Sequence, residues 1–542
     1  MSNFTIRDTF LIPSFDLEEK EREKLDKFLL LLERSVVEKF FKTASSKGGR
    51  PSYSPYNMFA TILYGFAFGS PTLRQLEESC RFDLRYFYLM EQDRPSFMSF
   101  GDFINGVFVP NRNEIFSLIT NEIIKECSID ISDLFIDGSK FEADANKYKF
   151  VWKPTKNHIK LSDKIRTLLN DLDMSNAVPK DGIIESRLIA TKLSELSVKV
   201  EDDVLLKKKY ELLSQYLIKS LEYEEKERIC GPDRNSYYKT DHDATAMCLK
   251  EDYYSGLGSN MHAGYNTQLA VSKGIICAYY VSSSRNDLKD FIPVLESFRN
   301  NFDRYPKRVC ADSGYGSLEN YEYLNQRNIG NYVKYFTFNG NVSGRNPDPY
   351  FLEDDGTLIC LNGHKGSRIE IDNRHPKSAA AVFYKVEGCA SCPFSTYCKR
   401  HQKIKDEDFK IFEVVERLAF YKQEAFNNLL TPKGIEMRVN RSSQVEGAFG
   451  IIKEDMNYTR LRRISKEKVE TEFMLTFIGY NIRKLFRYFD GKARFNYWVA
   501  PADLQPEKKK KPSAKRLANR MNKKKSTSVN QKSKENYKSR YK

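Results

Sequence analysis

The sequence predicts an α/β protein in which a mixed β-sheet follows a helical amino-terminal region. Three observations support this fold class. Residues 17–125 carry apolar side chains at helical spacing. From residue 134 to residue 336, short apolar runs typical of buried strands recur, with helical patterns between the later ones. The 542 residues include 40% hydrophobic and 13% aromatic side chains, which is enough to build a core.

The helical region is expected over residues 1–128. Ser54 before Pro55 is a typical helix start, because a capping side chain precedes a proline in the first turn. Thr72 and Gln75 have the spacing of a capping box, which predicts the start of another helix. Arginines lie among aromatic residues later in this region. That mixture suits contacts with DNA phosphates, and it suits an ordinary helical bundle equally well.

The mixed sheet is predicted over residues 129–490. Three meandering strands come first, and helices and strands then alternate. In chain order these elements are expected at residues 134–139, 265–271, 275–282, 287–298, 308–311, 318–325 and 332–336. This order of elements matches the ribonuclease-H-like fold.

Two long segments are expected to interrupt that order as insertions. Residues 155–232 are heavily charged around an apolar stripe at helical spacing, which predicts a helical hairpin that projects from the sheet. Residues 345–405 are Cys-rich and hold four clustered thiols: Cys360, Cys389, Cys392 and Cys398. Four thiolates suit a structural Zn²⁺ in a loop-rich segment with little core of its own, and His364 or His401 could replace a ligand. The alternative is a set of reduced thiols packed in a loop.

Three carboxylates form the candidate catalytic site. Asp137 and Asp312 each follow a predicted strand, and Glu446 lies on a predicted helix. Taken alone, an Asp at the end of a strand is more often a simple turn former. Together, the three side chains predict a site for two Mg²⁺ or Mn²⁺ ions that act on phosphate esters. Lys453 lies on the same side of the helix as Glu446, about 10 Å along its axis, where it could contact a neighbouring phosphate.

The net charge of +15 is concentrated near the carboxyl-terminal end. Residues 505–542 hold 15 Lys or Arg against 2 Asp or Glu, so the other residues are nearly neutral, with 73 against 71. We expect residues 491–542 to form a basic disordered tail that binds phosphates nonspecifically or solubilises the chain. No apolar run of about 18 residues and no signal-peptide pattern occur, so we expect a cytoplasmic protein without a membrane partner.

Several motifs together resemble the DDE transposases of bacterial insertion sequences, and among them the group numbered eleven eighty-two. The motifs are residues 136–140, 142–148, 239–245, 264–268, 311–315 and 444–453, and the resemblance spans residues 50–490. It implies that Asp137, Asp312 and Glu446 are a DDE triad, with Lys453 beside it. It also implies an enzyme that cuts DNA at the ends of a mobile element and joins the freed 3′ hydroxyls to target DNA.

Further expectations follow from the resemblance. The amino-terminal region would bind terminal inverted repeats, and the partners would be double-stranded DNA and a second copy of the chain, in a nucleoid-associated bacterial protein. Related transposases carry a Tyr-x2-Arg-x3-Glu-x6-Lys signature at the third carboxylate. Here Val439 and Ser442 stand at the Tyr and Arg positions, and Arg441 is the adjacent residue that could substitute.

Two other functions remain open from the sequence. The first is a catalytically silent, domesticated transposase that acts as a DNA-binding protein. The second is a host nuclease of the ribonuclease-H-like type, which would cut DNA without depending on terminal repeats. The presence of all three carboxylates and of Lys453 favours the active transposase over both.

Overall fold

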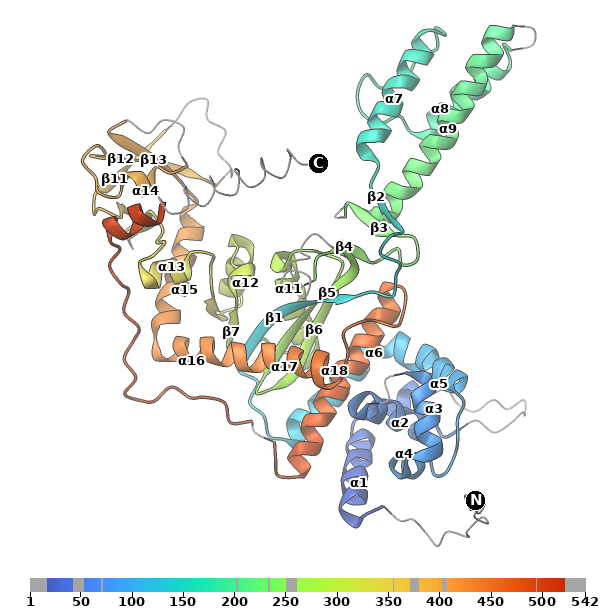
Figure 1. Ribbon diagram of the computed structural model, residues 1–542, viewed down its shortest axis with the longest axis vertical. Coiled ribbons are helices and arrows are strands. Elements are labelled where there is room, and N and C mark those ends of the chain that lie inside the picture. Colours follow the sequence, from blue (N-terminus) through green and yellow to red (C-terminus); the bar gives the residue numbers. More distant parts are fainter. Residues whose placement is uncertain are drawn as a thin grey trace, which may run out of the picture.

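The computed structural model describes residues 17–41, 53–69, 72–200, 203–232, 234–249, 261–353, 355–370, 380–401, 407–493 and 495–521. A central sheet lies between a group of amino-terminal helices and a second, smaller sheet, and a helical arm extends away from it (Figure 1). The predicted mixed α/β architecture with a helical amino-terminal region is therefore confirmed. The last part of the expected tail, residues 522–542, lies outside the described residues.

The amino-terminal region is helical, as predicted. Its elements are α1 (Glu19–Arg34), the 3₁₀ turn η1 (Val37–Phe40), α2 (Pro55–Phe68), α3 (Leu73–Phe82), α4 (Leu84–Leu89), α5 (Phe97–Phe103), the π-helical segment η2 (Ile104–Phe108) and α6 (Val109–Glu126). Both predicted caps are present. The Ser54 hydroxyl accepts a hydrogen bond from the Asn57 amide, and Thr72 and Gln75 form a capping box. Each cap satisfies amide groups that a helix start leaves without partners.

The central sheet is mixed, as the sequence predicts. Its strands are β1 (Asp133–Glu142), β4 (Thr245–Met247), β5 (His262–Ser272), β6 (Ile275–Ser282), β7 (Arg308–Ala311) and β8 (Gly330–Val333). The order is β4-β5-β1-β7-β8, and β6 pairs with residues 266–272 of β5. Strand β1 runs antiparallel to β5 and parallel to β7, and β7 runs parallel to β8. The long strand β1 is thus central, the end of β7 lies beside its middle, and the end of β8 lies beside that of β7.

Helices pack around this sheet and tie it to the amino-terminal region. They include η3 (Asp287–Asp290), α11 (Phe291–Phe302), α12 (Leu318–Gln326) and α18 (Lys466–Phe489). Asn481 of the buried helix α18 bonds both backbone groups of Ile276 in β6, each at 2.9 Å. On α18, a Cβ at Gly479 would lie 2.8 Å from the Phe66 backbone, so this glycine allows α2 to approach closely. Helix α18 therefore joins the two parts of the core.

The helical arm lies between two short paired strands, β2 (Phe150–Trp152) and β3 (Ser236–Tyr238). It consists of α7 (Thr155–Asn170), α8 (Ser186–Ser197) and α9 (Val204–Cys230), which extend beyond the sheet in Figure 1. The arm has an apolar cluster of its own, which includes Ile165, Leu169, Ile189 and Leu213. Its helices therefore stabilise one another without the central core.

The segment that forms the smaller sheet contains the four clustered cysteines. After α13 (Phe338–Ser343) come β9 (Tyr350–Leu352), β10 (Leu358–Cys360), β11 (Lys365–Ile369), β12 (Val382–Glu387), the short helix α14 (Ser395–Cys398) and β13 (Phe409–Val414). The strands pair antiparallel in the order β13-β12-β11-β10-β9. Its small core includes Leu358, Tyr384 and Phe412.

A nearly continuous helical segment then returns to the central sheet. It consists of α15 (Glu416–Leu430), α16 (Pro432–Arg441), the π-helical segment η5 (Ser442–Glu446), α17 (Gly447–Gly450) and the π-helical segment η6 (Ile451–Asp455). Figure 1 shows α16 and α17 crossing the sheet beside β1 and β7. This crossing brings the candidate residue Glu446 toward the strand ends.

The chain after α18 differs in part from the disordered tail that we expected from residue 491. Along residues 495–521 it makes specific contacts: the amides of Glu507 and Lys510 donate to the carbonyls of Leu430 and Val342 at 2.9 and 3.0 Å. Leu517 is buried. Periodic apolar residues are sparse in this basic segment, so its packing could not be foreseen from composition. Among the described residues, no helix has the length and apolar character needed to cross a membrane.

Candidate active site

The strand register places two of the predicted carboxylates side by side. Ile136 of β1 is aligned with Ala311 of β7, and Ala311 is aligned with Val333 of β8. The next residue on β1 is Asp137, and the residue that follows β7 is Asp312. Since aligned residues on neighbouring strands share one face of the sheet, these carboxylates belong to one site.

The Asp137 carboxylate is held by its surroundings. One oxygen accepts a hydrogen bond from the Gly138 amide at 2.9 Å, and the other accepts from Nη1 of Arg441 at 2.8 Å. Burial raises the pKa of the Asp137 carboxyl, the Arg441 guanidinium opposes this rise, and the Asp312 carboxylate adds to it. Asp137 is thus a desolvated acid whose negative charge is favourable only beside a cation.

Arg441 also binds the third predicted carboxylate. Its Nη2 donates to Oε1 of Glu446 at 2.9 Å, and the Ser442 hydroxyl donates to the other oxygen at 3.0 Å. The Arg441 side chain is 12% exposed, and that of Glu446 is 51% exposed. One guanidinium therefore links two acids that lie far apart in the sequence.

The π-helical segment η5 explains why the arginine is at position 441. In an α-helix, residues that face each other are three or four positions apart, so position 442 would face Glu446. A π-helix has i→i+5 hydrogen bonds and turns less per residue, which brings residue 441 toward the side of residue 446. Arg441 therefore reaches Glu446, although regular α-helical spacing would favour position 442.

Lys453 lies beyond α17, in the second π-helical segment η6. Its Nζ donates to the Lys140 carbonyl of β1 at 3.1 Å and lies 4.8 Å from the centre of the Phe141 ring. The predicted lysine is thus attached to the same strand that carries Asp137. Its contact with a DNA phosphate stays a prediction.

A buried polar network around Gln268 of β5 contacts both β1 and the turn that follows β7. A Cβ at Gly138 would lie only 2.5 Å from Oε1 of Gln268, its aligned neighbour on β5. Tyr315 follows Asp312 by three residues, and its hydroxyl donates to Oε1 of the buried Gln268. Nε2 of Gln268 in turn donates to Asp287 at 2.9 Å. Sequence reasoning missed Gln268 and Tyr315 as site residues, although the motifs that carry the resemblance include both, and it named Arg441 only as a possible substitute for the signature arginine.

The chemistry of the three carboxylates suits divalent ions, but their present geometry does not. Within the described part of the chain, no three His, Cys, Asp or Glu side chains are arranged to hold a metal ion. At the candidate site, the Arg441 guanidinium lies between Asp137 and Glu446. Mg²⁺ takes carboxylate oxygens and needs few protein ligands, so Asp137, Asp312 and Glu446 are an appropriate donor set.

The predicted zinc site finds no support. Burial raises the pKa of the Cys389 and Cys398 thiols, and the neighbouring cysteines add to this rise. The four thiols are therefore near one another, yet they are not arranged as metal ligands in the described structure. Lys410 Nζ lies 3.4 Å from Sγ of Cys398 instead.

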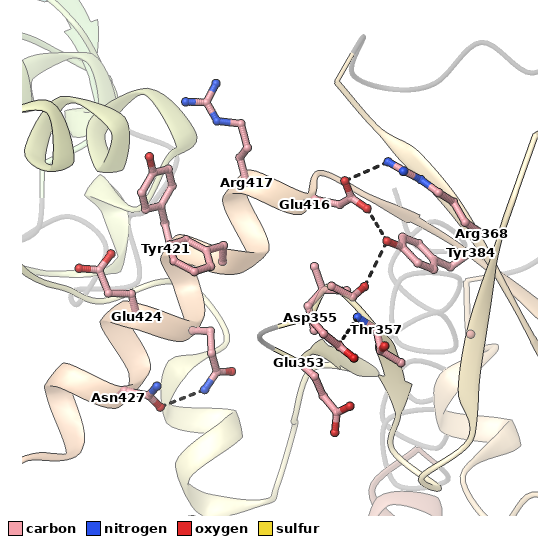
Figure 2. Close-up of a pocket in the computed structure, with 15 residues that line it drawn as sticks. Glu353, Asp355, Thr357, Arg368, Tyr384, Glu416, Arg417, Tyr421, Glu424 and Asn427 are labelled. Atoms are coloured by element: carbon pink, nitrogen blue, oxygen red, sulfur yellow. Dashed lines mark hydrogen bonds and ion pairs between the residues drawn. The ribbon is translucent and has the colours of Figure 1, made fainter.

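A cavity of about 910 Å³ lies between the smaller sheet and α15 (Figure 2). Glu416 accepts hydrogen bonds from Tyr384 and, at 3.1 Å, from Arg368, and burial raises the pKa of Glu424. None of the three candidate carboxylates lines this cavity. It is therefore separate from the candidate active site.

Two parts of the chain match known protein families. Residues 359–486, which include Glu446 and Lys453, match a family described as "Transposase DDE domain". Residues 14–106 match a family described as "Transposase domain (DUF772)" and fall within the amino-terminal region. No curated protein and no solved structure matches the chain. These two matches support a DDE transposase with an amino-terminal DUF772 domain.

Proposed function

We propose that the chain is an active transposase that cuts DNA at the ends of an insertion sequence and joins the 3′ hydroxyls to target DNA. The observation that carries this proposal is the shared guanidinium: Arg441 binds both Asp137 and Glu446, with Asp312 on the neighbouring strand end. Acids from three distant parts of the chain are gathered around one positive charge, which is what a site for cations requires.

The three carboxylates would hold two Mg²⁺ or Mn²⁺ ions. Such ions activate an attacking hydroxyl or water and stabilise the leaving oxygen when bound. The chain itself contributes rigidity, because β1 and β7 fix the two aspartates while α16 and α17 carry the third acid to them. Lys453, anchored to β1, would position the DNA backbone.

The finer assignments belong to the same proposal. The strand order, with β1 between antiparallel β5 and parallel β7, supports a ribonuclease-H-like catalytic domain at residues 129–490. Residues 155–232 and 345–405 would be its insertions, and residues 1–128 would bind the terminal repeats. Synapsis of two ends needs at least a dimer on DNA. The protein would be nucleoid-associated and encoded by a bacterial insertion sequence of group eleven eighty-two.

The catalytically silent alternative has one observation in its favour. Arg441 already neutralises Asp137 and Glu446, so the acids are satisfied without metal ions. In a DNA-binding protein that has lost catalysis, this ion-pair network would be purely structural. The same fold would still bind terminal repeats.

A cleavage assay separates the two functions. Purified protein, Mg²⁺ and a duplex with the inverted repeats that flank the gene are incubated, and strand products are resolved by length. We expect cuts at the repeat ends that Asp137→Asn abolishes while the variant still shifts the duplex in a gel. Asp171→Asn, on the exposed end of α7, is the matched control and should cut normally. Binding without any cut by the wild type supports the silent protein, and cuts that ignore the repeats support a host nuclease.

A further inference from the structure

Lys334 lies at the strand end next to Asp312, although no motif includes it. It follows β8 as Asp312 follows β7, and its amide donates to the Ala311 carbonyl at 3.1 Å, one step beyond the strand pairing. The register therefore places Asp137, Asp312 and Lys334 in one row across three adjacent strands. Residues at such matched positions share a face of the sheet.

The Lys334 ammonium is in an unfavourable place for a cation. Burial lowers its pKa, and the positive charges of Arg441 and Arg438 lower it further, while Cys310 and Asp312 act in the opposite direction. Within the described residues, no hydrogen bond or ion pair is formed by its Nζ, whereas Arg438 is paired with Glu507 and Arg441 with Asp137. A half-buried ammonium without a direct counterion is stabilised by any anion that reaches it.

The aromatic side chain of Phe336, two residues after Lys334, indicates which kind of anion would bind. Phe336 is 89% exposed, whereas Tyr335 and Phe338 on either side of it are buried, with 4% and 1% exposure. Two peptide units keep the Cα atoms of Lys334 and Phe336 within about 7 Å of each other. A cationic side chain beside an exposed ring is the combination that binds single-stranded nucleic acid, because the ring stacks on a base and the cation meets the backbone.

We propose that Lys334 and Phe336 hold one nucleotide of the DNA strand that crosses Asp312, with its phosphate on Lys334 and its base stacked on Phe336. This inference rests on the proposed function and adds to it a nucleotide subsite on the β8 side of the carboxylates. In this position Lys334 neutralises a phosphate next to the reacting one, and Phe336 keeps the unpaired base from moving. Both are positioning residues that act on the substrate strand rather than on the bond that breaks.

The test asks whether each side chain contacts one particular phosphate or base of the DNA. The probe is the terminal repeat duplex that is cut in the assay above, with the strand ends near the cut left unpaired. In one series, each phosphate near the cut is replaced in turn by an uncharged methylphosphonate, and in the other each base is removed. Affinities are measured in EDTA, where no metal-dependent cleavage occurs, for wild type, Lys334→Met and Phe336→Ala.

One methylphosphonate position should weaken wild-type binding about tenfold and leave Lys334→Met binding unchanged. One abasic position at the same nucleotide should weaken wild-type binding about tenfold and leave Phe336→Ala binding unchanged. Lys365→Met on β11 and Phe420→Ala on α15, both exposed, are matched controls and should respond like wild type.

Two failures have different meanings. If wild type cuts the repeats but every modified position weakens wild type and both variants equally, the nucleotide subsite is wrong and the proposed function stands. If wild type neither cuts nor prefers the repeats, the proposed function fails first. Normal melting temperatures of Lys334→Met and Phe336→Ala verify that both variants are folded, because neither side chain is fully buried.

Discussion

Arg441 donates to Asp137 through Nη1 at 2.8 Å and to Glu446 through Nη2 at 2.9 Å. This arrangement puts a fixed positive charge between two acids that the proposed mechanism assigns to divalent ions. The guanidinium therefore stabilises the site before ions bind, and it competes with them for the same oxygens. Both consequences can be measured.

Replacement of Arg441 by methionine should destabilise the metal-free protein and strengthen metal binding. The change leaves the Asp137 carboxylate without its partner, at a cost of about 2 kcal/mol for a partly buried pair. Without the competing guanidinium, the affinity for Mn²⁺ should rise about tenfold, which is about 1.4 kcal/mol. Thermal unfolding without metal and Mn²⁺ titration followed by calorimetry measure the two effects.

Asp137→Asn is the control for that titration, since it should lose Mn²⁺ binding whether or not Arg441 is present. An unchanged or weaker Mn²⁺ affinity in Arg441→Met would show that the arginine supports the ions instead of competing with them. Absence of Mn²⁺ binding in every variant, wild type included, would argue against the two-metal site itself.

Exchange of Arg441 and Ser442 tests the role of the π-helical segment η5. The double variant Arg441→Ser, Ser442→Arg keeps the composition and moves the arginine to the position of the family signature. We expect an arginine at position 442 to reach Glu446, as the serine does, but to miss Asp137, because position 442 is solvent-exposed. Its metal-free melting temperature should therefore equal that of Arg441→Ser alone. A return to the wild-type value would mean that this segment readily becomes a regular α-helix.

Gly138→Ala should disturb the site through Gln268. The new Cβ would lie 2.5 to 2.9 Å from the Gln268 carboxamide, which Tyr315 and Asp287 hold in place. We expect a loss of about 2 kcal/mol, typical of overpacking, and slower cleavage because the Asp312 turn shifts with Tyr315. Chemical unfolding gives the first quantity, and the cleavage assay gives the second.

A double-mutant cycle with Gln268→Ala identifies the cause of that loss. If the clash with the carboxamide is responsible, the double variant should lose clearly less stability than the sum of the two single variants. Additive losses would place the strain elsewhere, for example in the backbone of β1.

The sequence predicted the part of the site that depends on strands and failed where the backbone departs from regular geometry. Apolar runs that end in Asp137 and Asp312 predicted two strand ends, and the mixed sheet contains both. Arg441 was named only as a possible substitute for the signature arginine, and its contacts with Asp137 and Glu446 were not foreseen, because α-helical spacing assigns position 442, not 441, to the side of Glu446. Lys334 was also missed, since only the register across β1, β7 and β8 brings it next to Asp312.

Asp290 should make the stability of the protein depend on pH. Burial is the main cause that raises the pKa of its carboxyl from 3.8 to about 6, and Asp287 adds to the rise, while hydrogen bonds from Ser282 and Gln268 and the charge of Lys466 oppose it. Between these two values the folded chain keeps a proton that the unfolded chain has lost. The free energy of unfolding therefore falls as pH rises through this window, by at most about 3 kcal/mol, and is level above it.

Asp290→Asn removes that dependence because the amide does not titrate. Relative to wild type, the variant should gain stability from pH 4 to pH 6 and show a constant difference from pH 6 to pH 8. Melting temperatures of both proteins over this range provide the comparison, and Asp303→Asn, at an exposed position after α11, should track wild type throughout. A difference between Asp290→Asn and wild type that is the same at every pH would mean that Asp290 has an ordinary pKa in the folded chain.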